Sequence, residues 1–500
     1  MNEALIQALQ LVFDPFSFLL LAGGMALGII FGAIPGLTAT MAVALLIPIT
    51  FYLPPAEGIV MLCGVYVGGI YGGSISACLV NIPGTPSSMV TTLDGYPMGQ
   101  RGEAGKAIGY VTFASFIGGM LSALILIFFA PILAKVAFKF GPVEYFAVAV
   151  FGLSIISSVS GDSFIKGCIS GVLGMMVTVV GMDYVTSTPR FTFGTTALLS
   201  GLTFIPVMIG LFGMREFLMQ IGTGTYKFQV VQKVGRILPS FSEMKKNFAL
   251  CIRGGLIGTF VGILPGAGGP IASFISYDME RRASKHPEKF GTGIPEGICA
   301  SESANNGVTG GALIPTLTLG VPGDGVTAVM LGAFMVHNIQ PGPNLFSNNT
   351  TFVYSVYIGF VIANILMLIL GLAGARLFAK VLDIPMAILL PFISLLTIVG
   401  SFSIRNTAVD IVIMLALGVL GYVMSELKLP VMPMVLGIVL GPIAESNLRG
   451  ALLISKGDWS IFVKEPISLF LLIISVVLAS WPLISKKILG KTPVQRPVGE

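Results

Sequence analysis

The chain has 500 residues, of which 54% are hydrophobic and 10% are charged, and its mean hydropathy is +0.92. Soluble domains carry about 25% charged residues, so the composition excludes a soluble protein and predicts one that crosses a membrane several times. The net charge of +5 is small, and we expect no nucleic-acid partner. Five scattered cysteines and two histidines predict neither a disulfide framework nor a structural metal site.

Two proline-glycine motifs each occur twice along the chain. Residues 32–36 (GAIPG) return as residues 262–266 (GILPG), and residues 81–85 (NIPGT) return as residues 320–324 (GVPGD). Broken helices at corresponding places in two halves are typical of the binding site of secondary transporters. We therefore expect an all-α polytopic membrane protein with an inverted-topology internal repeat, broken helices, re-entrant hairpins and about 10–12 membrane-spanning helices.

Residues 1–213 form the first predicted repeat. It opens with a hairpin at about residues 16–53, and the first Lys or Arg of the chain is Arg101. Because basic residues concentrate on the cytoplasmic side, we expect this hairpin and the N-terminus to face the outside. A broken motif follows at residues 81–95. The predicted spans of this half are residues 57–80, 107–131, 143–160, 165–182 and 195–213.

Residues 214–252 are predicted to form a cytoplasmic linker, because their basic residues outnumber the acidic ones. These basic residues are Arg215, Lys227, Lys233, Arg236, Lys245 and Lys246. The second repeat is expected at residues 253–450. It opens with a hairpin at residues 253–282 that has basic residues at both ends, so we expect it to enter from the cytoplasm, with arms of about 15–18 Å.

The second repeat continues with a broken motif at residues 302–325. Its predicted spans are residues 297–318, 350–375, 385–402, 407–425 and 430–445. Residues 451–500 add a last helix at 467–485 and a basic, cytoplasmic tail. Five crossings in each half invert the second half relative to the first. In this scheme Arg190 and Arg449 lie outside, against the general bias.

The polar residues around the breaks fit an anion site deep in the membrane. A helix interrupted there survives only where protein, water or ligand satisfies its backbone, and a half-helix can direct its N-terminal N–H groups at an anion. The substrate-binding residues that we expect are Asn81, Gly84, Thr85, Ser87, Ser88, Asn305, Asn306, Gly323 and Asp324. Hydroxyls and free carbonyls suit a cation, and the candidates are Gly36, Thr38, Thr40, Gly266, Thr316 and Thr318.

Simpler interpretations stand beside these. A proline-glycine pair can be an ordinary kink or loop, and glycine pairs can serve close helix packing. Glu302 and Asp324 can be loop charges at a membrane face, and Thr38 and Thr40 can be N-caps. The sequence has no Walker loop and pairs no nucleophile with a histidine base, so we expect no enzyme.

The two broken motifs resemble a known family. Residues 71–98, which include YGGSIS and NIPGTPSS, and residues 304–324, which read ANNGVTGGALIPTLTLGVPGD, are similar to the signature of the large membrane subunit of tripartite tricarboxylate transporters, the TctA family. The resemblance covers roughly residues 15–485.

The resemblance implies a subunit of a symporter in the bacterial inner membrane. Its partners would be a small membrane subunit of about four helices and a periplasmic solute-binding protein, and its cargo citrate or a related carboxylate. No cofactor is expected beyond a coupling ion, Na⁺ or H⁺. Other tricarboxylates, dicarboxylates and aromatic acids remain alternatives for the cargo. A passive channel and a non-transporting scaffold subunit remain alternatives for the function.

Overall fold

The computed structural model of this chain describes residues 2–156, 163–183, 185–223, 235, 237–382, 384 and 386–488. In this part the chain is almost entirely helical, and its only sheet pairs β1 (Gly181–Met182) with β2 (Pro189–Arg190) in antiparallel orientation. The prediction of an all-α polytopic protein is confirmed. Most of the central part of the predicted linker, residues 224–234 and 236, and the end of the predicted tail, 489–500, lie outside the described residues.

The helices of the first half follow one another from the N-terminus to residue 223. They are α1 (Asn2–Phe13), α2 (Pro15–Ala33), α3 (Ala39–Thr50), α4 (Pro55–Val80), η1 (Pro86–Ser88), α5 (Met89–Met98), η2 (Gly99–Glu103), α6 (Ala104–Ala137), α7 (Pro142–Ser154), α9 (Phe164–Val179), η3 (Thr196–Leu198), α10 (Phe204–Ile209), η4 (Gly210–Met214) and α11 (Arg215–Thr223).

The helices of the second half begin after the predicted linker region. They are α12 (Phe241–Ile263), α13 (Gly268–Ala283), η5 (Pro287–Lys289), α14 (Pro295–Leu319), α15 (Gly325–Val336), α16 (Pro343–Asn348), α17 (Thr350–Val381), α18 (Met386–Ser403), α19 (Ala408–Glu426), α20 (Val431–Ile454), α21 (Ile461–Lys464) and α22 (Pro466–Ile488).

Both halves use the same order of elements. A pair of helices, α2–α3 or α12–α13, is followed by a long helix, α4 or α14, that ends in the left-handed conformation at Asn81 (φ 58°) or Gly320 (φ 69°). After this interruption the chain resumes as η1 and α5 or as α15. The long helices also pack alike, α4 against α2, α3 and α17, and α14 against α12, α13 and α6. The predicted repeats, 1–213 and 253–450, stay a prediction that this order supports.

The second helix pair is longer than predicted. α12 begins at Phe241 rather than near residue 253, because Ser240 and Glu243 form a capping box. The backbone N–H of Ser240 donates to Glu243 Oε2 at 2.8 Å, and that of Glu243 donates to Ser240 Oγ at 3.3 Å. The 23 residues of α12 span about 34 Å. α12 is therefore about twice as long as the predicted arm of about 15–18 Å, and it begins inside the predicted linker, residues 214–252, whose bounds stay a prediction.

The span predicted at residues 195–213 starts too early. Residues 189–203 instead contain β2 and the short η3, and the helical segment begins only at Phe204. Gly194 and Gly201 adopt positive φ values of 74° and 79°, which glycine tolerates and a continuing helix does not. Residues 195–203 therefore lie outside the helix, although the predicted span included them.

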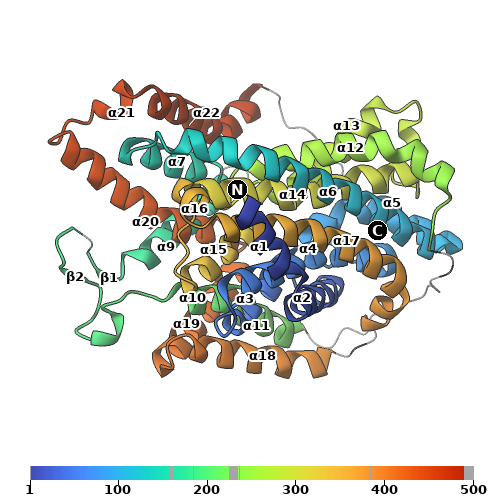
Figure 1. The fold of residues 1–500 in the computed structure, drawn as a ribbon, viewed down its shortest axis with the longest axis horizontal. Helices are drawn as coiled ribbons and strands as arrows, with labels where there is room; N and C mark the ends of the chain where they lie inside the picture. Colours follow the sequence, from blue (N-terminus) through green and yellow to red (C-terminus); the bar gives the residue numbers. More distant parts are fainter. Residues whose placement is uncertain are drawn as a thin grey trace.

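Seven helical segments of the described chain are long and apolar enough to cross a membrane, so the protein is a multi-pass membrane protein. They are Pro15–Ala33, Pro55–Val80, Pro86–Ala137, Phe204–Ile221, Thr350–Val381, Ala408–Glu426 and Val431–Ile454. α14 is absent from this set although it has 25 residues, because it carries many polar side chains. It is instead buried among other helices, and Figure 1 shows it beside α6 and α12.

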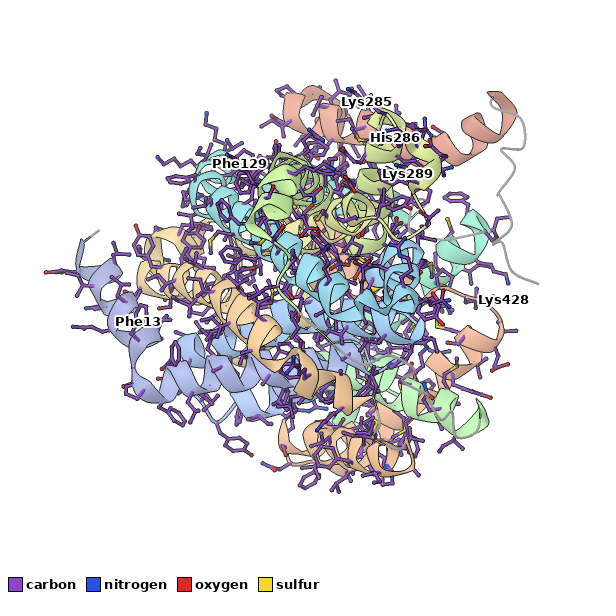
Figure 2. All side chains as sticks on the ribbon, turned by 90° about the vertical axis from the view of Figure 1, so that its right-hand side faces the viewer. Phe13, Phe129, Lys285, His286, Lys289 and Lys428 are labelled. Carbon is purple, nitrogen blue, oxygen red and sulfur yellow. The ribbon has the colours of Figure 1, made fainter. Side chains whose placement is uncertain are left out.

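The side chains on the outside of the molecule fit a lipid environment along the helices and water at their ends. Phe13 of α1 and Phe129 of α6 are exposed aromatic residues, and Figure 2 shows both at the margin of the molecule. Lys285, His286 and Lys289 gather together in the same view, beyond the end of α13. Such separation of apolar and basic side chains is expected of a membrane-embedded helical protein.

Candidate functional site

The two interruptions pack against the two helix pairs in the same way. We call residues 81–85 the first break and residues 320–324 the second break. A Cβ built on Gly84 would lie 1.9 Å from the carbonyl oxygen of Gly32, and one built on Gly323 would lie 2.3 Å from that of Gly262. Each half thus brings its two proline-glycine motifs into contact, at a separation that only glycine permits.

The second break is also joined to the turn between α12 and α13. The N–H of Gly266 donates to the carbonyl oxygen of Gly323 at 2.9 Å. A Cβ on Gly268 would lie 3.8 Å from Cβ of Asp324. The turn after α12 and the second break therefore form one structural unit.

The next glycine of this turn reaches the first break. A Cβ on Gly269 would lie 2.6 Å from Cβ of Ser87 and 2.8 Å from Oδ1 of Asn305. Ser87 belongs to η1, directly after the first break, and Asn305 lies within α14. The start of α13 consequently connects the two breaks, and residues expected in one site, Ser87 and Asn305, come together there.

The start of α3 approaches the second break from the first half. Oγ1 of Thr40 lies 3.4 Å from the position that a Cβ on Gly325 would occupy, at the first residue of α15. α3 also packs against α15, as α13 packs against η1. Four helical segments, α3, η1–α5, α13 and α15, therefore begin around the breaks. Their N-terminal N–H groups and dipoles favour an anion.

Asn305 carries an amide that is ready for a ligand. Its side chain is fully buried beside the Glu302 carboxylate, and within the described chain neither its oxygen nor its nitrogen has a hydrogen-bond partner of ordinary geometry. Leaving one buried polar group unpaired costs about 1–3 kcal/mol, so such groups call for a physical explanation. The Oδ1 of this amide faces Gly269 at the start of α13; with the amide turned over, its nitrogen would donate to a carboxylate bound there.

The other residues expected at the first break have local roles. Ser88 Oγ donates to the carbonyl oxygen of Gly73 at 2.9 Å, and the hydroxyls of Thr85 and Ser87 are 3.1 Å apart. These contacts fix the turn that leads into α5. Asn81 is exposed and ends α4 in the left-handed conformation. This backbone conformation accounts for an asparagine at the end of the helix.

Asp324 is the N-cap of α15. The N–H of Thr327 donates to its Oδ1 at 2.8 Å, and the hydroxyl of Tyr66 on α4 donates to its Oδ2 at 2.5 Å. Its side chain is only 7% exposed. The alternative that Asp324 is a loop charge at a membrane face is therefore wrong.

Three of the candidate cation ligands, Thr40, Gly266 and Thr316, lie around the second break. Thr316 Oγ1 donates to Ala312 O at 2.6 Å and lies 3.5 Å from Val321 O at the second break, which Gly266 also contacts. Three other candidates have local positions. Thr318 Oγ1 donates to the carbonyl of Ile314, Thr38 Oγ1 accepts the N–H of Met41 as an N-cap, and Gly36 lies against Gln220 of α11. The N-cap interpretation of Thr38 is confirmed.

Glu302 is a buried carboxylate that we did not include among the predicted ligands. It lies on α14, is fully buried, and accepts hydroxyl hydrogen bonds from Ser74 (2.7 Å), Ser115 (3.3 Å) and Thr91. The alternative that it is a loop charge at a membrane face is wrong. An acidic residue inside the predicted span 297–318 was the signal in the sequence.

Asn306, one turn after Glu302 on α14, belongs to the same polar group. Its amide nitrogen donates to Ser115 Oγ at 2.7 Å, whereas its Oδ1 is without a partner among the described residues.

The glycine pairs of the first half serve helix packing. Cβ atoms on Gly68 and Gly72 would lie 2.4 Å from the carbonyl oxygens of Met25 and Ile29, so the close-packing interpretation is confirmed for them.

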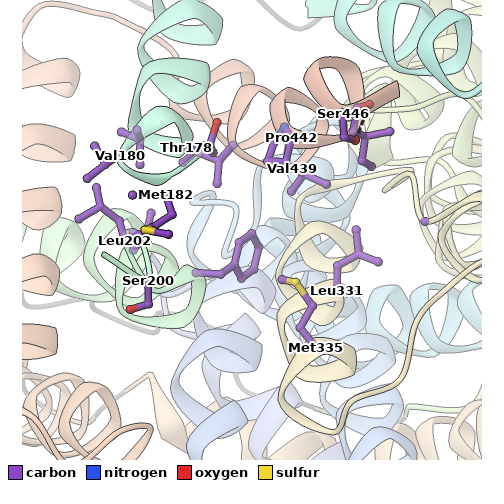
Figure 3. A pocket seen from close by; sticks show the side chains of 18 of the residues that line it. Thr178, Val180, Met182, Ser200, Leu202, Leu331, Met335, Val439, Pro442 and Ser446 are labelled. Carbon is purple, nitrogen blue, oxygen red and sulfur yellow. Dashed lines mark hydrogen bonds between the residues drawn. The ribbon is translucent and has the colours of Figure 1, made fainter. Parts of the chain in front are cut away.

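A large cavity leads to the second break. It has a volume of about 1220 Å³ and lies between α9, the β1–β2 ribbon, α15 and α20, and Leu319 and Gly320 line it. Figure 3 shows Thr178, Met335 and Val439 among the side chains around this space. The cavity is large enough for a small organic anion.

Ion pairs hold the rim of this cavity. Asp183 lies 3.1 Å from Arg190 and 2.7 Å from Arg449, and Arg190 lies 2.7 Å from Glu445. The backbone N–H of Thr186, that of Val185 and the Arg449 guanidinium together lower the pKa of Asp183 below its ordinary value. The pairs connect the β1–β2 ribbon to α20, so they fix the shape of the rim of the cavity.

The fold and the site together define a membrane transporter: apolar spans enclose a polar helix, and broken helices meet around it. A model of the tripartite tricarboxylate transporter TctA family matches residues 18–436, and the chain belongs to this family. It is thus the membrane subunit of a tripartite system with further subunits, and a transporter component.

Two relatives come from Agrobacterium vitis. One, an uncharacterized 52.8 kDa protein in the TAR-I ttuC' 3' region, is 38% identical over 467 residues, which cover 93% of each chain. The other, an uncharacterized protein in the TAR-II ttuC' 3' region, is 40% identical over 233 residues, which cover 46% of this chain and 96% of the relative. No solved structure matches the chain.

Proposed function

We propose that this chain is the permease subunit of a binding-protein-dependent secondary transporter that imports citrate or a related carboxylate by symport with Na⁺ or H⁺. A periplasmic solute-binding protein delivers the anion, and a small membrane subunit of about four helices completes the complex. The chain lies in the bacterial inner membrane, with its N-terminus in the periplasm and its C-terminus in the cytoplasm. Membership of the TctA family supports this proposal.

The observation that carries the proposal is the meeting of helix starts at the two breaks. Ser87, Gly269 and Asn305 approach one another where η1 and α13 begin, and the Asn305 amide has no hydrogen-bond partner of ordinary geometry in the described chain. Backbone N–H groups at helix N-termini bind carboxylates and phosphates in many proteins. A carboxylate of the substrate binds here, between the first break and α14.

The nearest basic residues in the sequence do not clamp the anion. Arg101 donates to the carbonyl oxygens of Thr292 and Gly293, and Lys106 pairs with Glu243 at 2.5 Å. The positive potential at the site therefore comes from helix dipoles and from a cation bound together with the substrate. This requirement favours symport over a passive channel.

The cavity beside the β1–β2 ribbon is the outer entrance in this proposal. The predicted topology places Arg190 and Arg449 outside, and both belong to the ion pairs at the rim of the cavity. An anion released by the binding protein enters there and reaches Gly320 at the second break. Alternating access then closes this route and opens one to the cytoplasm.

Uptake into vesicles tests the proposal. The chain is reconstituted with its two partner proteins, and uptake of ¹⁴C-citrate is measured with an inward Na⁺ gradient, an inward proton gradient or neither, in parallel with labelled dicarboxylates and aromatic acids. We expect accumulation above the external concentration of one carboxylate with one of the two gradients. Equilibration that ignores both gradients would indicate a channel, and no flux of any carboxylate would indicate a scaffold subunit.

A further inference from the structure

Glu302 is a fully buried acidic residue on α14, the helix that leads into the second break. Three helices direct hydroxyls at it: Ser74 of α4 and Thr91 of α5 donate to Oε1, and Ser115 of α6 donates to Oε2. Thr91 belongs to the helix that resumes after the first break. The Glu302 carboxylate therefore contacts α4, α5 and α6 at the same time.

No positive charge compensates Glu302 in the described chain, whose ion pairs do not include it. An ionised carboxylate that is buried without a partner costs several kcal/mol, and hydroxyl donors offset only part of this cost. The Glu302 carboxylate is therefore expected to bind a cation.

The titratable groups on the helices packed around α14 do not supply this charge. Asp94 of α5 is held by the Tyr277 hydroxyl of α13 (2.8 Å) and by the backbone N–H groups of Gly291, Gly293 and Ile294. Arg253 of α12 is exposed and pairs with Glu280, Lys246 of α12 pairs with Glu296 of α14, and Asp324 of α15 accepts from Tyr66. Lys106 of α6 pairs with Glu243 of α12. The titratable side chains that interact with Glu302 itself are a phenol and two thiols: Tyr71, Cys78 and Cys299.

A second observation points to a ligand at the same place. Oδ1 of Asn306 is fully buried without a partner in the described chain, and the amide nitrogen of the same side chain donates to Ser115, which itself donates to Glu302. The oxygens of Glu302, its hydroxyl donors and Asn306 form an oxygen-only set. Hard cations prefer oxygen ligands.

We propose that Glu302 holds one monovalent cation, H⁺ or Na⁺, and that this cation is the coupling ion of transport. The proposal rests on the proposed function and names the residue that would carry its coupling. Asn305, which reaches Ser87 and Gly269, is on the same helix three residues further on. A cation at Glu302 neutralises a carboxylate on the same helix as Asn305, so each ion favours binding of the other.

Cation binding by the purified full-length chain tests the proposal without any substrate. The chain is studied in lipid nanodiscs as wild type, as Glu302→Gln and as Glu144→Gln. The last variant is the matched control, because Glu144 is also a buried glutamate but accepts the N–H of Gly141 as the cap of α7. One arm measures the thermal unfolding midpoint with NaCl against choline chloride at equal ionic strength. The other measures the infrared band of protonated carboxyl groups against pH.

We expect one of two results. If the ion is Na⁺, NaCl raises the unfolding midpoint of the wild type and of Glu144→Gln by several degrees, and Glu302→Gln loses this response. If the ion is H⁺, one protonated carboxyl band titrates in the wild type and in Glu144→Gln and is missing from Glu302→Gln. The proposal is overturned if Glu302→Gln keeps the response of the wild type, or if the wild type shows neither response.

A second pair of variants covers the case that Glu302→Gln does not fold. Thr91→Val removes one hydroxyl donor to Glu302, whereas Thr92→Val, its neighbour, removes only a hydroxyl that donates to Met89 O on the exposed side of α5. Thr91→Val should change the cation concentration at half saturation about tenfold, and Thr92→Val should leave it unchanged. Equal behaviour of the two variants would contradict the proposal. A wild type that binds the cation but accumulates no carboxylate would instead contradict the proposed function.

Discussion

The two breaks share a backbone design but differ in charge. Both end a long helix with a left-handed residue, Asn81 or Gly320, and both place a glycine on a carbonyl of the preceding helix pair. The first break is followed by neutral hydroxyls, of which Ser87 reaches α13. The second ends in the carboxylate of Asp324. One backbone arrangement thus presents two different chemistries, a neutral one that suits an anion and an acidic one that suits a cation.

The helices that lead into the breaks differ even more. α14 carries Glu302, Asn305 and Asn306 in its buried interior, whereas the positions of α4 at the same distances before its left-handed end are Cys63, Tyr66 and Val67. The polar groups of the site therefore come mainly from one half, and the other half supplies glycines for close packing and the hydroxyls that hold Glu302. The site is therefore asymmetric in its polar side chains, although the two halves share a backbone arrangement at the breaks.

The shared backbone design predicts the largest effect. Gly84→Ala and Gly323→Ala each force a methyl group onto a backbone carbonyl oxygen, at 1.9 and 2.3 Å before relaxation. We expect each to lower the free energy of unfolding by about 3 kcal/mol, measured by thermal unfolding in nanodiscs. Gly23→Ala of α2 is the control, because no atom lies within 4 Å of the added Cβ. A stable Gly84→Ala variant would show that the breaks are not tightly packed.

The neutral amide and the carboxylate of α14 predict different defects. Asn305→Ala removes the amide beside Ser87, so the KM for the transported carboxylate should rise about 10- to 100-fold, with an unchanged dependence on the driving ion. Glu302→Gln removes the carboxylate proposed to hold the cation and should instead alter the dependence on the ion. Asn364→Ala is the control, since this buried asparagine of α17 donates to Phe360 O. Equal defects in Asn305→Ala and Asn364→Ala would mean that only packing is affected.

A smaller effect is expected from the hydroxyl that anchors the second break. Tyr66→Phe removes the donor to the Asp324 carboxylate, and we expect the free energy of unfolding to fall by about 2 kcal/mol, as for hydrogen bonds to charged groups. Tyr71→Phe on the same helix removes a bond to the neutral hydroxyl of Thr112 and should cost about 1 kcal/mol. Chemical denaturation of both variants measures the difference, and a reversed order would contradict an ionised Asp324.

The sequence predicted the breaks because proline and glycine act locally. The interruptions after α4 and α14 lie where the PG motifs indicated them, and the meeting of Ser87 with Asn305 followed from assigning both motifs to one site. The start of α12 was missed although Ser240 and Glu243 have the spacing of a capping box. This signal was available in the sequence.

The surroundings of Glu302 could not be derived in the same way. Its partners Ser74, Thr91 and Ser115 are about 190 to 230 positions away along the chain, on three helices whose relative rotation depends on packing. A single sequence gives the helix but not which face of it meets a neighbour. Tertiary packing therefore decides whether a carboxylate within a span is a ligand or a boundary charge.

The ion pairs of Asp183 at the rim of the cavity predict the smallest effect. The folded-state pKa of Asp183 is lowered, first by the N–H of Thr186 and also by Arg449. Its stabilisation is therefore complete above the ordinary Asp value of about 4 and is lost as the pH falls through the lower folded value. Below about pH 4, hydrogen exchange in the β1–β2 ribbon, corrected for intrinsic rates, should rise, and Asp183→Asn should show raised exchange already at pH 7.

Asp458 provides the control for this experiment. The hydroxyl and N–H of Ser460, together with Lys464, lower its pKa to about 2, but it lies in the turn between α20 and α21, away from the cavity lining. Asp458→Asn should raise exchange only in its own turn. If Asp183→Asn leaves the exchange of the ribbon and the rate of carboxylate uptake unchanged, the ion pairs do not shape the entrance. The second break would then be reached by another route.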